Sequence, residues 1–262
     1  MGGHICTPWL VALCQMTLLR RLLDPIIDVG RILPGMGAYV RYVADWRAYA
    51  SMEHAESLRL RDAYPCLYDD TASTSVDPHY FYQDIWAFKA IQRSGAPSHI
   101  DVGSRAILVG MLSAVTRVTF VDIRPLLVAL DNFESKKGSL LELPFGDGSV
   151  ASLSCLHVAE HVGLGRYGDS LDPEGTRKAA REMSRVLRRG GNLYISVPIG
   201  RPRVCFNAHR IHAPQQIIEY FGDLELVSFA AVDDGGGFSP RADPADFTDA
   251  SYACGMFHFV AV

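Results

Sequence analysis

The amino-acid sequence predicts an α/β protein, in which a doubly wound, mostly parallel sheet follows an N-terminal helical extension. From residue 98 onward, short apolar segments of strand length alternate with helical segments, a pattern that implies right-handed crossovers and a sheet covered on both faces. Before residue 95 the pattern is mainly helical and is interrupted by prolines. We therefore predict two parts: an extension over residues 1–95, which also covers the ligand cleft, and a sheet domain over residues 96–262.

The extension begins with an apolar run from Trp9 to Leu19, followed by Arg20 and Arg21. A membrane span needs about 20 apolar residues, and the charges follow the run rather than precede it as in a secretory signal. We expect a helix packed on the domain, with a membrane-surface anchor over residues 9–23 as the alternative. A further helix is predicted over residues 81–93, where apolar residues recur at helical spacing before Ser94-Gly95.

The sheet domain contains apolar segments of strand length with helical segments between them. Strands are predicted at residues 99–102, 117–121, 150–156, 192–197, 224–232 and 256–262, and helices at residues 105–114, 176–187 and 214–221. In open parallel sheets, ligands bind beyond the carboxyl ends of the strands, where the strand order reverses. Candidate site residues are therefore sought at the strand ends.

Composition excludes some classes of partner. The net charge of −4 provides no basic surplus for nucleic acid. The six cysteines are scattered without the spacing of a zinc site, which is typical of buried thiols in a reducing compartment. We expect a cytoplasmic protein without a transmembrane segment.

The first two strands end in residues that suit a nucleotide-like ligand. Asp101-Val-Gly103-Ser104 leads from a strand into a helix, and the glycine allows close approach of a ligand to the backbone and to the helix N-terminus. Asp122 ends the next strand about twenty residues later, where a carboxylate can accept both hydroxyls of a ribose. A helix N-cap is the alternative for Asp122.

Later motifs extend the pattern. They are Leu143-Pro-Phe-x-Asp147-x-Ser149, Glu160-His161, and Arg185-Val-Leu-x-x-Gly190-Gly191 before a strand. Taken in order with Asp101-x-Gly103 and Asp122, they resemble the small-molecule, type 11-like branch of the class I S-adenosylmethionine-dependent methyltransferases, over residues 98–262. With residues 77–84, 163–169 and 206–210 included, the chain resembles a bacterial subfamily catalogued as a domain of unknown function, whose members tend to lie near polysaccharide genes.

The resemblance implies a seven-stranded, Rossmann-like sheet whose last strand, at residues 256–262, is antiparallel. It implies S-adenosyl-L-methionine as cofactor, with Asp101, Gly103 and Ser104 at its methionine end and Asp122 at its ribose. Ile123 and Leu140 would flank the adenine, and Ser139 stands where an acidic residue often meets the adenine amino group. The glycine-rich loop of the superfamily is incomplete, because residues 104–107 contain no glycine.

Candidate catalytic residues follow the third and fourth strands. Methyl transfer requires the acceptor to be held in line with the methyl group, and a hydroxyl acceptor also needs a base. His157, Glu160, His161 and His209 are the candidates, although capping of a loop, for Glu160 and His161, and ordinary polar burial, for His209, are alternatives. In related ubiquinone-pathway O-methyltransferases, a Glu-x-x-Glu-His array can hold a divalent ion; His157 takes its first position here, and we expect no metal.

Candidate acceptor contacts lie in three segments. They are His79 and Tyr82, Arg166 and Tyr167 in a loop over residues 163–172, and Asn207 and Arg210. An Arg fork can bind a phosphate or carboxylate, and a Tyr can stack on a sugar. The alternatives are packing for the aromatic residues and, for Arg166, an ion pair with Asp169 or Asp172 that closes the loop.

These observations together predict an S-adenosylmethionine-dependent methyltransferase that methylates a small-molecule or saccharide acceptor, with a sugar hydroxyl favoured. A nicotinamide dehydrogenase would require a complete Gly-x-Gly-x-x-Gly, which is missing. A catalytically silent methyltransferase-like binding module is the second alternative. The acceptor, the methylated atom and the oligomeric state do not follow from the sequence.

Overall fold

The computed structural model describes residues 29–262, with side chains from residue 35, and the chain divides into two compact units, residues 1–75 and 76–262. The first unit contains α2 (Val29–Ala50) and a short 3-10 helix, η1 (Leu60–Asp62). The predicted apolar segment at residues 9–23 lies outside the described residues. Among the residues that the structure describes, no helix combines the length and apolarity needed to cross a bilayer.

The second unit starts with α3 (Pro78–Ser94), which begins earlier than predicted. Asp77 caps this helix by accepting hydrogen bonds from the backbone N–H groups of His79 and Tyr80, and Pro78 occupies the first helical position. Gly95 ends the helix in the left-handed conformation, as predicted. The division between the units at residues 75 and 76 therefore assigns α3 to the sheet unit, whereas the sequence analysis assigned it to the extension.

The sheet has the strand order β3-β2-β1-β4-β5-β10-β8-β9. Its parallel part comprises β1 (Ser98–Val102), β2 (Arg117–Asp122), β3 (Phe133–Lys137), β4 (Val150–Leu156) and β5 (Leu187–Ile199). β10 (Ala253–Ala261) lies antiparallel between β5 and β8 (Leu224–Val232), as expected for the last strand. The predicted count of seven strands is wrong, because the two-residue β9 (Phe238–Ser239) adds an eighth strand at the edge.

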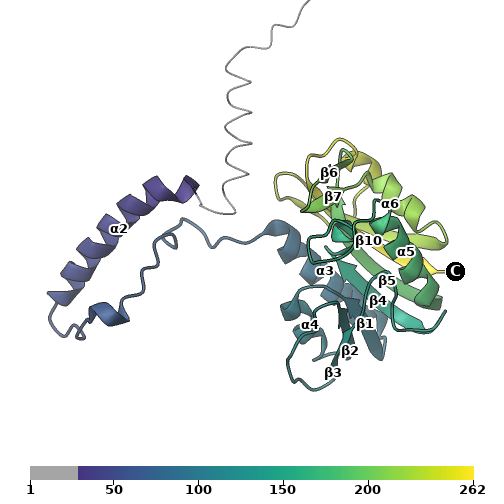
Figure 1. Cartoon of the computed structure of the whole chain (residues 1–262), viewed down its shortest axis with the longest axis horizontal. Coiled ribbons are helices and arrows are strands. Elements are labelled where there is room, and N and C mark those ends of the chain that lie inside the picture. Colours follow the sequence, from purple (N-terminus) through teal and green to yellow (C-terminus); the bar gives the residue numbers. More distant parts are fainter. Residues whose placement is uncertain (1–28) are drawn as a thin grey trace, which may run out of the picture. The chain divides into compact units, whose positions relative to one another are not determined.

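Helices cover both faces of the sheet (Figure 1). α3 and α4 (Ala106–Leu112) pack on one face through a core that includes Ala87, Ile91 and Leu108. α5 (Gly175–Val186) and α6 (Pro214–Tyr220) pack on the other through Met183 and Ile217. A separate two-stranded sheet, β6 (Arg203–Cys205) and β7 (His209–Ile211), follows β5. The strand order reverses between β1 and β4, so the expected ligand site lies at the carboxyl ends of these strands.

Candidate functional site

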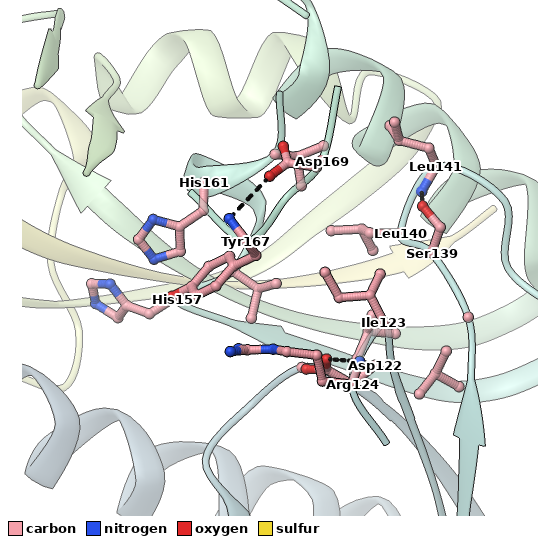
Figure 2. A pocket seen from close by; sticks show the side chains of 16 residues that line it. Asp122, Ile123, Arg124, Ser139, Leu140, Leu141, His157, His161, Tyr167 and Asp169 are labelled. Atoms are coloured by element: carbon pink, nitrogen blue, oxygen red, sulfur yellow. Dashed lines mark hydrogen bonds between the residues drawn. The ribbon is translucent and has the colours of Figure 1, made fainter. Parts of the chain in front are cut away.

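A cavity of about 130 Å³ lies at the expected edge of the sheet, beyond the ends of β1, β2 and β4. Of the predicted site residues, it brings together Gly103, Asp122, Ile123, Ser139, Leu140, His157, His161 and Tyr167. Figure 2 shows His157 and His161 at one end of this first cavity and Ser139 and Leu140 at the other. The cavity therefore has a titratable end and a more apolar end.

Gly103 and Asp122 meet at the middle of the first cavity. Gly103 has a φ of +70°, and a Cβ added there would lie 3.0 Å from Val158 Cγ1, so the glycine is required by both conformation and space. The same Cβ would lie 3.4 Å from Asp122 Oδ2. Asp122 Oδ1 accepts a hydrogen bond of 2.7 Å from the backbone N–H of Arg124, and no helix follows, so the N-cap alternative is wrong.

The apolar end suits a flat ring. Ile123 and Leu140 both line it. Ser139 Oγ accepts a hydrogen bond of 3.1 Å from the backbone N–H of Leu141, so the hydroxyl is partly used by its own turn. Gly138 allows this turn to approach β2, because a Cβ there would lie 2.6 Å from Val121 Cγ1.

Asp101 and Ser104 lie behind the first cavity and are not among its lining residues. Asp101 Oδ1 accepts from the backbone N–H of Ser104 at 3.0 Å, and Oδ2 accepts from the Ser154 hydroxyl. The Ser104 hydroxyl accepts from the backbone N–H of Leu156 at 3.2 Å. Both side chains therefore position the turn that carries Gly103, and burial raises the pKa of Asp101 to about 6.

His157 is the most constrained residue at the site. It is 8% exposed and has a φ of +53°, which is unusual for a non-glycine residue. Its Nδ1 lies 2.9 Å from Glu160 Oε1 and its Nε2 lies 3.3 Å from Cys254 Sγ. Burial by itself lowers the pKa of His157, but the Cys254 sulfur and the Glu160 carboxylate outweigh it and raise the pKa well above its usual range.

Glu160 is completely buried beneath the histidines. Burial opposes its charge, but the hydrogen bond and charge of His157 leave its pKa below the usual value. Its Oε2 has no hydrogen-bond partner among the described residues. Glu160 is therefore an anion that orients His157 and, at 3.7 Å from Oε1 to Nε2, lies close to His161.

Five aromatic side chains lie around His157 and Glu160: His79, Tyr80, His161, His209 and Tyr252. The His79 ring lies 5.9 Å from the His157 ring and 5.1 Å from the Tyr252 ring, and the Tyr80 ring lies 5.3 Å from the His157 ring. The His209 ring lies 5.1 Å from the Tyr252 ring and 6.5 Å from the His161 ring. Burial lowers the pKa of both His79 and His209, so both are neutral at neutral pH.

A second, more open cavity of about 500 Å³ lies on the other side of His157. Its lining includes Asp77, His79, Tyr80, Asp234 and Tyr252 as well as His157. Since His157 lines both cavities, it forms part of the wall between them.

The predicted acceptor loop at residues 163–172 has Tyr167 at the first cavity. The Arg124 guanidinium lies 4.5 Å and the Arg166 guanidinium 5.1 Å from the Tyr167 ring. Arg166 donates to the Ala208 carbonyl at 3.2 Å, whereas Asp169 accepts from backbone N–H groups and Asp172 pairs with Lys178. The predicted alternative of an Arg166 ion pair with Asp169 or Asp172 is therefore wrong.

The structure does not bring the remaining predicted acceptor contacts to the two cavities. Arg210 is buried and donates to the carbonyls of Val162 (2.5 Å) and Asp172 (2.8 Å), at the two ends of the loop. Tyr82 stacks on Phe238 at 4.7 Å, and Asn207 is exposed. None of the three lines the first or second cavity.

Cys254, Tyr252 and Arg124 are residues that the sequence analysis missed. Cys254 pairs in register with Pro198, because β10 is antiparallel to β5 and starts where β5 ends. The start of the predicted antiparallel strand was the available signal, but residues 253–255 lay outside its predicted limits. Cys155 and Cys254 are buried thiols as predicted, whereas Cys66 is exposed.

Comparisons with known proteins identify the fold. A family model described as a Caenorhabditis protein of unknown function, DUF268, matches residues 136–234. No curated protein matches the chain.

Several solved structures resemble the chain at low identity. The N-methyltransferase NodS from Bradyrhizobium japonicum WM9, in complex with S-adenosyl-L-homocysteine, has 14% identity and a TM-score of 0.51, over 83% of this chain and 97% of that one. A putative sarcosine dimethylglycine methyltransferase from Galdieria sulphuraria has 15% identity and a TM-score of 0.50, over 69% and 86%. The cyclase SpnF has 14% identity and a TM-score of 0.50, over 70% and 81%. These structures include a cyclase, so what the similarity shows is a Rossmann-like methyltransferase fold.

Proposed function

We propose that the protein is an S-adenosylmethionine-dependent methyltransferase that acts on a hydroxyl group of a small molecule or saccharide in the cytoplasm. The observation that carries this proposal is the pair of cavities that share His157, one at the strand switch point and one beside it. A methyl donor in the first cavity and an acceptor in the second would meet at this wall. The free thiols Cys155 and Cys254 are consistent with a reducing compartment.

Residues that line the first cavity could bind each part of the cofactor. Asp122, with Oδ2 beside Gly103, would accept hydrogen bonds from the ribose hydroxyls. Ile123 and Leu140 would contact the adenine, and Gly103 would allow the methionine end to approach the backbone near His157. When bound, the cofactor supplies an electrophilic methyl group on a sulfonium. The NodS structure contains S-adenosyl-L-homocysteine in a fold of this kind.

The second cavity suits a hydroxylated acceptor. Tyr80 lines this cavity with a ring on which a sugar can stack, whereas the Tyr252 ring already lies against the His79 and His209 rings. Asp77 and Asp234 are carboxylates that can bind hydroxyls. Transfer forms an oxygen–carbon bond, breaks the sulfur–carbon bond, and releases the hydroxyl proton. Neutral His79 lines this cavity and can take that proton. Neutral His209 lines neither cavity but lies against Tyr252, which lines this one, and is a second candidate. His157, held protonated by Glu160 and Cys254, is better suited to orient the acceptor.

A catalytically silent binding module remains the second candidate, because one observation favours it. The first cavity, at about 130 Å³, is smaller than the roughly 300–1,000 Å³ of ordinary ligand sites. The stacked side chains of Arg124 and Tyr167 both line it, so these side chains must separate to admit a cofactor.

Thermal unfolding tests the proposal directly. S-adenosylmethionine and S-adenosylhomocysteine should raise the melting temperature of the purified protein, and NAD should not. Incubation with methyl-labelled S-adenosylmethionine and a panel of saccharides should then transfer the label to one class of hydroxyl. No shift with either sulfur compound would refute the methyltransferase and support the silent module. A shift without label transfer to any saccharide would refute the proposed acceptor class.

A further inference from the structure

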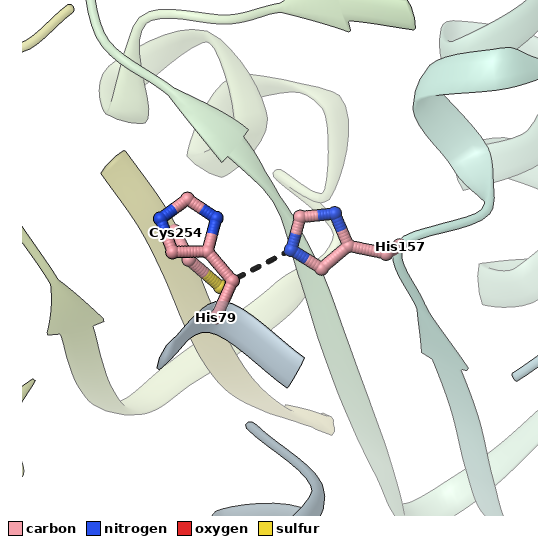
Figure 3. A group of neighbouring side chains, drawn as sticks. All are labelled: His79, His157 and Cys254. Carbon is pink, nitrogen blue, oxygen red and sulfur yellow. Dashed lines mark hydrogen bonds between the residues drawn. The ribbon is translucent and has the colours of Figure 1, made fainter. Parts of the chain in front are cut away.

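His79, His157 and Cys254 come together from three separate segments of the sheet unit. His79 lies in the first turn of α3, His157 follows β4, and Cys254 is the second residue of β10. One ligand atom from each lies within 4.8 Å of the other two. His157 and Cys254 are buried, and His79 is half-buried. Figure 3 shows the His157 ring nitrogen directed at the Cys254 sulfur, with the His79 side chain next to them.

The separation of the His157 and Cys254 donors is close to that around a tetrahedral metal ion. Zinc–sulfur bonds of about 2.3 Å and zinc–nitrogen bonds of about 2.0–2.1 Å place the two donors about 3.6 Å apart. The observed distance from His157 Nε2 to Cys254 Sγ is 3.3 Å. A small rotation of either side chain would therefore reach the required separation.

His157 is already oriented as a metal ligand. Its Nδ1 lies 2.9 Å from Glu160 Oε1, and Glu160 is 0% exposed. A carboxylate that accepts from Nδ1–H directs the Nε2 lone pair to a metal and raises the basicity of the ring. The backbone of His79 is held in turn by the Asp77 cap.

We propose that His79, His157 and Cys254 bind one zinc ion, with Glu160 as the outer partner of His157. Two imidazoles and one thiolate are a borderline-soft donor set, and three protein ligands leave a fourth position open. His79 and His157 line the second cavity, so an acceptor hydroxyl or water there could reach the ion and occupy that position. Zinc binding itself does not depend on the proposed methyltransferase function; only the hydroxyl at the fourth position rests on that function.

X-ray absorption at the zinc edge tests the ligands in the unmodified protein. The full-length chain, purified without chelator and supplied with zinc, should contain one zinc per chain. Its spectrum should show one sulfur at about 2.3 Å and a nitrogen or oxygen shell at about 2.0–2.1 Å. A site with no sulfur, a chain that retains no zinc after dialysis, or a stoichiometric preference for copper or iron would each overturn the assignment.

Cobalt absorption compares the unmodified protein with variants of the site and with a matched control. Cobalt in the unmodified protein should give the intense near-ultraviolet band of a thiolate–cobalt bond, and C254S should lose this band. C155S, which removes another fully buried cysteine, should retain it. E160Q should lower zinc affinity by about 10–100-fold while the band persists. Retention of the band in C254S would refute the proposal, and the absorption spectrum of the unmodified protein decides the outcome if C254S does not fold.

The zinc proposal and the proposed methyltransferase function can fail independently of each other. A protein that binds zinc and does not respond to S-adenosylmethionine would retain the metal site and lose the proposed function. A protein that binds S-adenosylmethionine without zinc would show the reverse.

Discussion

At the residue scale, the protonation states of the histidines decide what the site can do. His157 lies between Glu160 and Cys254, which raise its pKa against the effect of burial, whereas His79 and His209 lack a carboxylate in direct contact and burial lowers their pKa. Closely placed residues of the same type are therefore suited to different tasks. Without a metal ion, His157 is a fixed cation and the other two are neutral proton acceptors. With the proposed zinc ion bound, His79 and His157 are ligands, and His209 is the one of the three that can accept a proton.

Asp122→Ala should weaken binding of S-adenosylhomocysteine at least tenfold. The reason is the loss of charge-assisted hydrogen bonds to the ribose, worth about 1.5–3 kcal/mol. Calorimetry measures this affinity, and circular dichroism should show an unchanged fold. Glu134→Ala, which removes a carboxylate from neighbouring β3 that pairs with Lys136, is the matched control and should bind normally. Equal affinity in the two variants would exclude Asp122 as the ribose ligand.

His209→Ala should lower turnover by about 10²–10⁴ with cofactor affinity unchanged, if His209 takes the acceptor proton. Because burial places the pKa of His209 below 6.5, kcat/KM of the unmodified enzyme should rise with pH below that value and level off above it. The variant should lose this acid limb. His258→Ala removes another partly buried histidine, bonded to Asn192, and should keep both rate and profile. Full activity in His209→Ala would mean that His79 or solvent accepts the proton of the acceptor hydroxyl.

At the element scale, buried polar side chains join β1 to β4 behind the site. His99 Nδ1 and Nε2 each lie 2.8 Å from a serine hydroxyl, of Ser152 and Ser154, and Ser154 donates to Asp101. Burial lowers the pKa of His99 to about 3 and raises that of Asp101 to about 6. Burial thus keeps both groups uncharged under mildly acidic conditions. The chain of hydrogen bonds positions the turn that carries Gly103.

The His99 imidazole and the Asp101 carboxyl should make the stability of the protein depend on pH in opposite directions. Below pH 6.5 the unfolded chain takes up a proton on His99 that the native state does not, so stability falls as pH falls toward about 3. Native Asp101 keeps its proton up to about pH 6 while unfolded Asp101 loses it near 3.8, so this carboxyl contributes stability that is lost as pH rises through that window.

Urea unfolding of Asp101→Asn therefore tests the dependence that comes from Asp101. The unmodified protein and the variant differ in their free energy of unfolding. As pH rises from 4 to 6, this difference (unmodified minus variant) should fall by up to about 1.4 kcal/mol per pH unit. Asp131→Asn, at an exposed position, should give a constant difference. A constant difference for Asp101→Asn as well would mean that its pKa is not raised in the native state.

The Leu143-Pro-Phe-x-Asp147 motif is held to α5 by side-chain hydrogen bonds. Arg185 of α5 donates to Asp147, Glu182 and the carbonyls of Leu143 and Phe145, and Glu182 accepts from the backbone N–H of Leu143. These bonds attach the segment after Leu140 to α5. The motif therefore serves to position the apolar end of the first cavity.

At the scale of the whole molecule, the sheet unit contains every described residue that lines the two cavities. Every buried hydrophobic cluster in the described part of the chain lies within residues 76–262, and so do the linings of both cavities. The helical unit and the sheet unit are separate compact bodies.

A fragment of residues 76–262 should therefore fold on its own. We expect one cooperative thermal transition within a few degrees of that of the full chain, because the fragment retains every core cluster found among the described residues. S-adenosylhomocysteine should stabilise the fragment and the full chain equally. Circular dichroism with and without ligand measures both quantities. A fragment that folds but does not respond to a ligand that stabilises the full chain would assign a cofactor-binding role to residues 1–75.

The sequence by itself determined the order of the elements and the location of the first cavity. Strand and helix periodicities depend on neighbouring residues, so β1, β2, β4 and α5 could be predicted locally. β3 escaped prediction because its sequence, Phe-Glu-Ser-Lys-Lys, is polar and its pairing with β2 is what makes it a strand. Gly103 and Asp122 were recognisable because a turn residue and a strand-end carboxylate have local signatures.

Only the tertiary structure decided which side chains reach the site. Asp101 and Arg210 carry charges that the sequence assigned to ligands, but the fold surrounds them with backbone and hydroxyl partners, which satisfy their hydrogen bonds internally. Cys254 reaches His157 across 97 residues of sequence, because β10 runs antiparallel to β5 and returns to its carboxyl end. Contacts between residues so distant in sequence depend on strand order and burial, neither of which a local pattern contains.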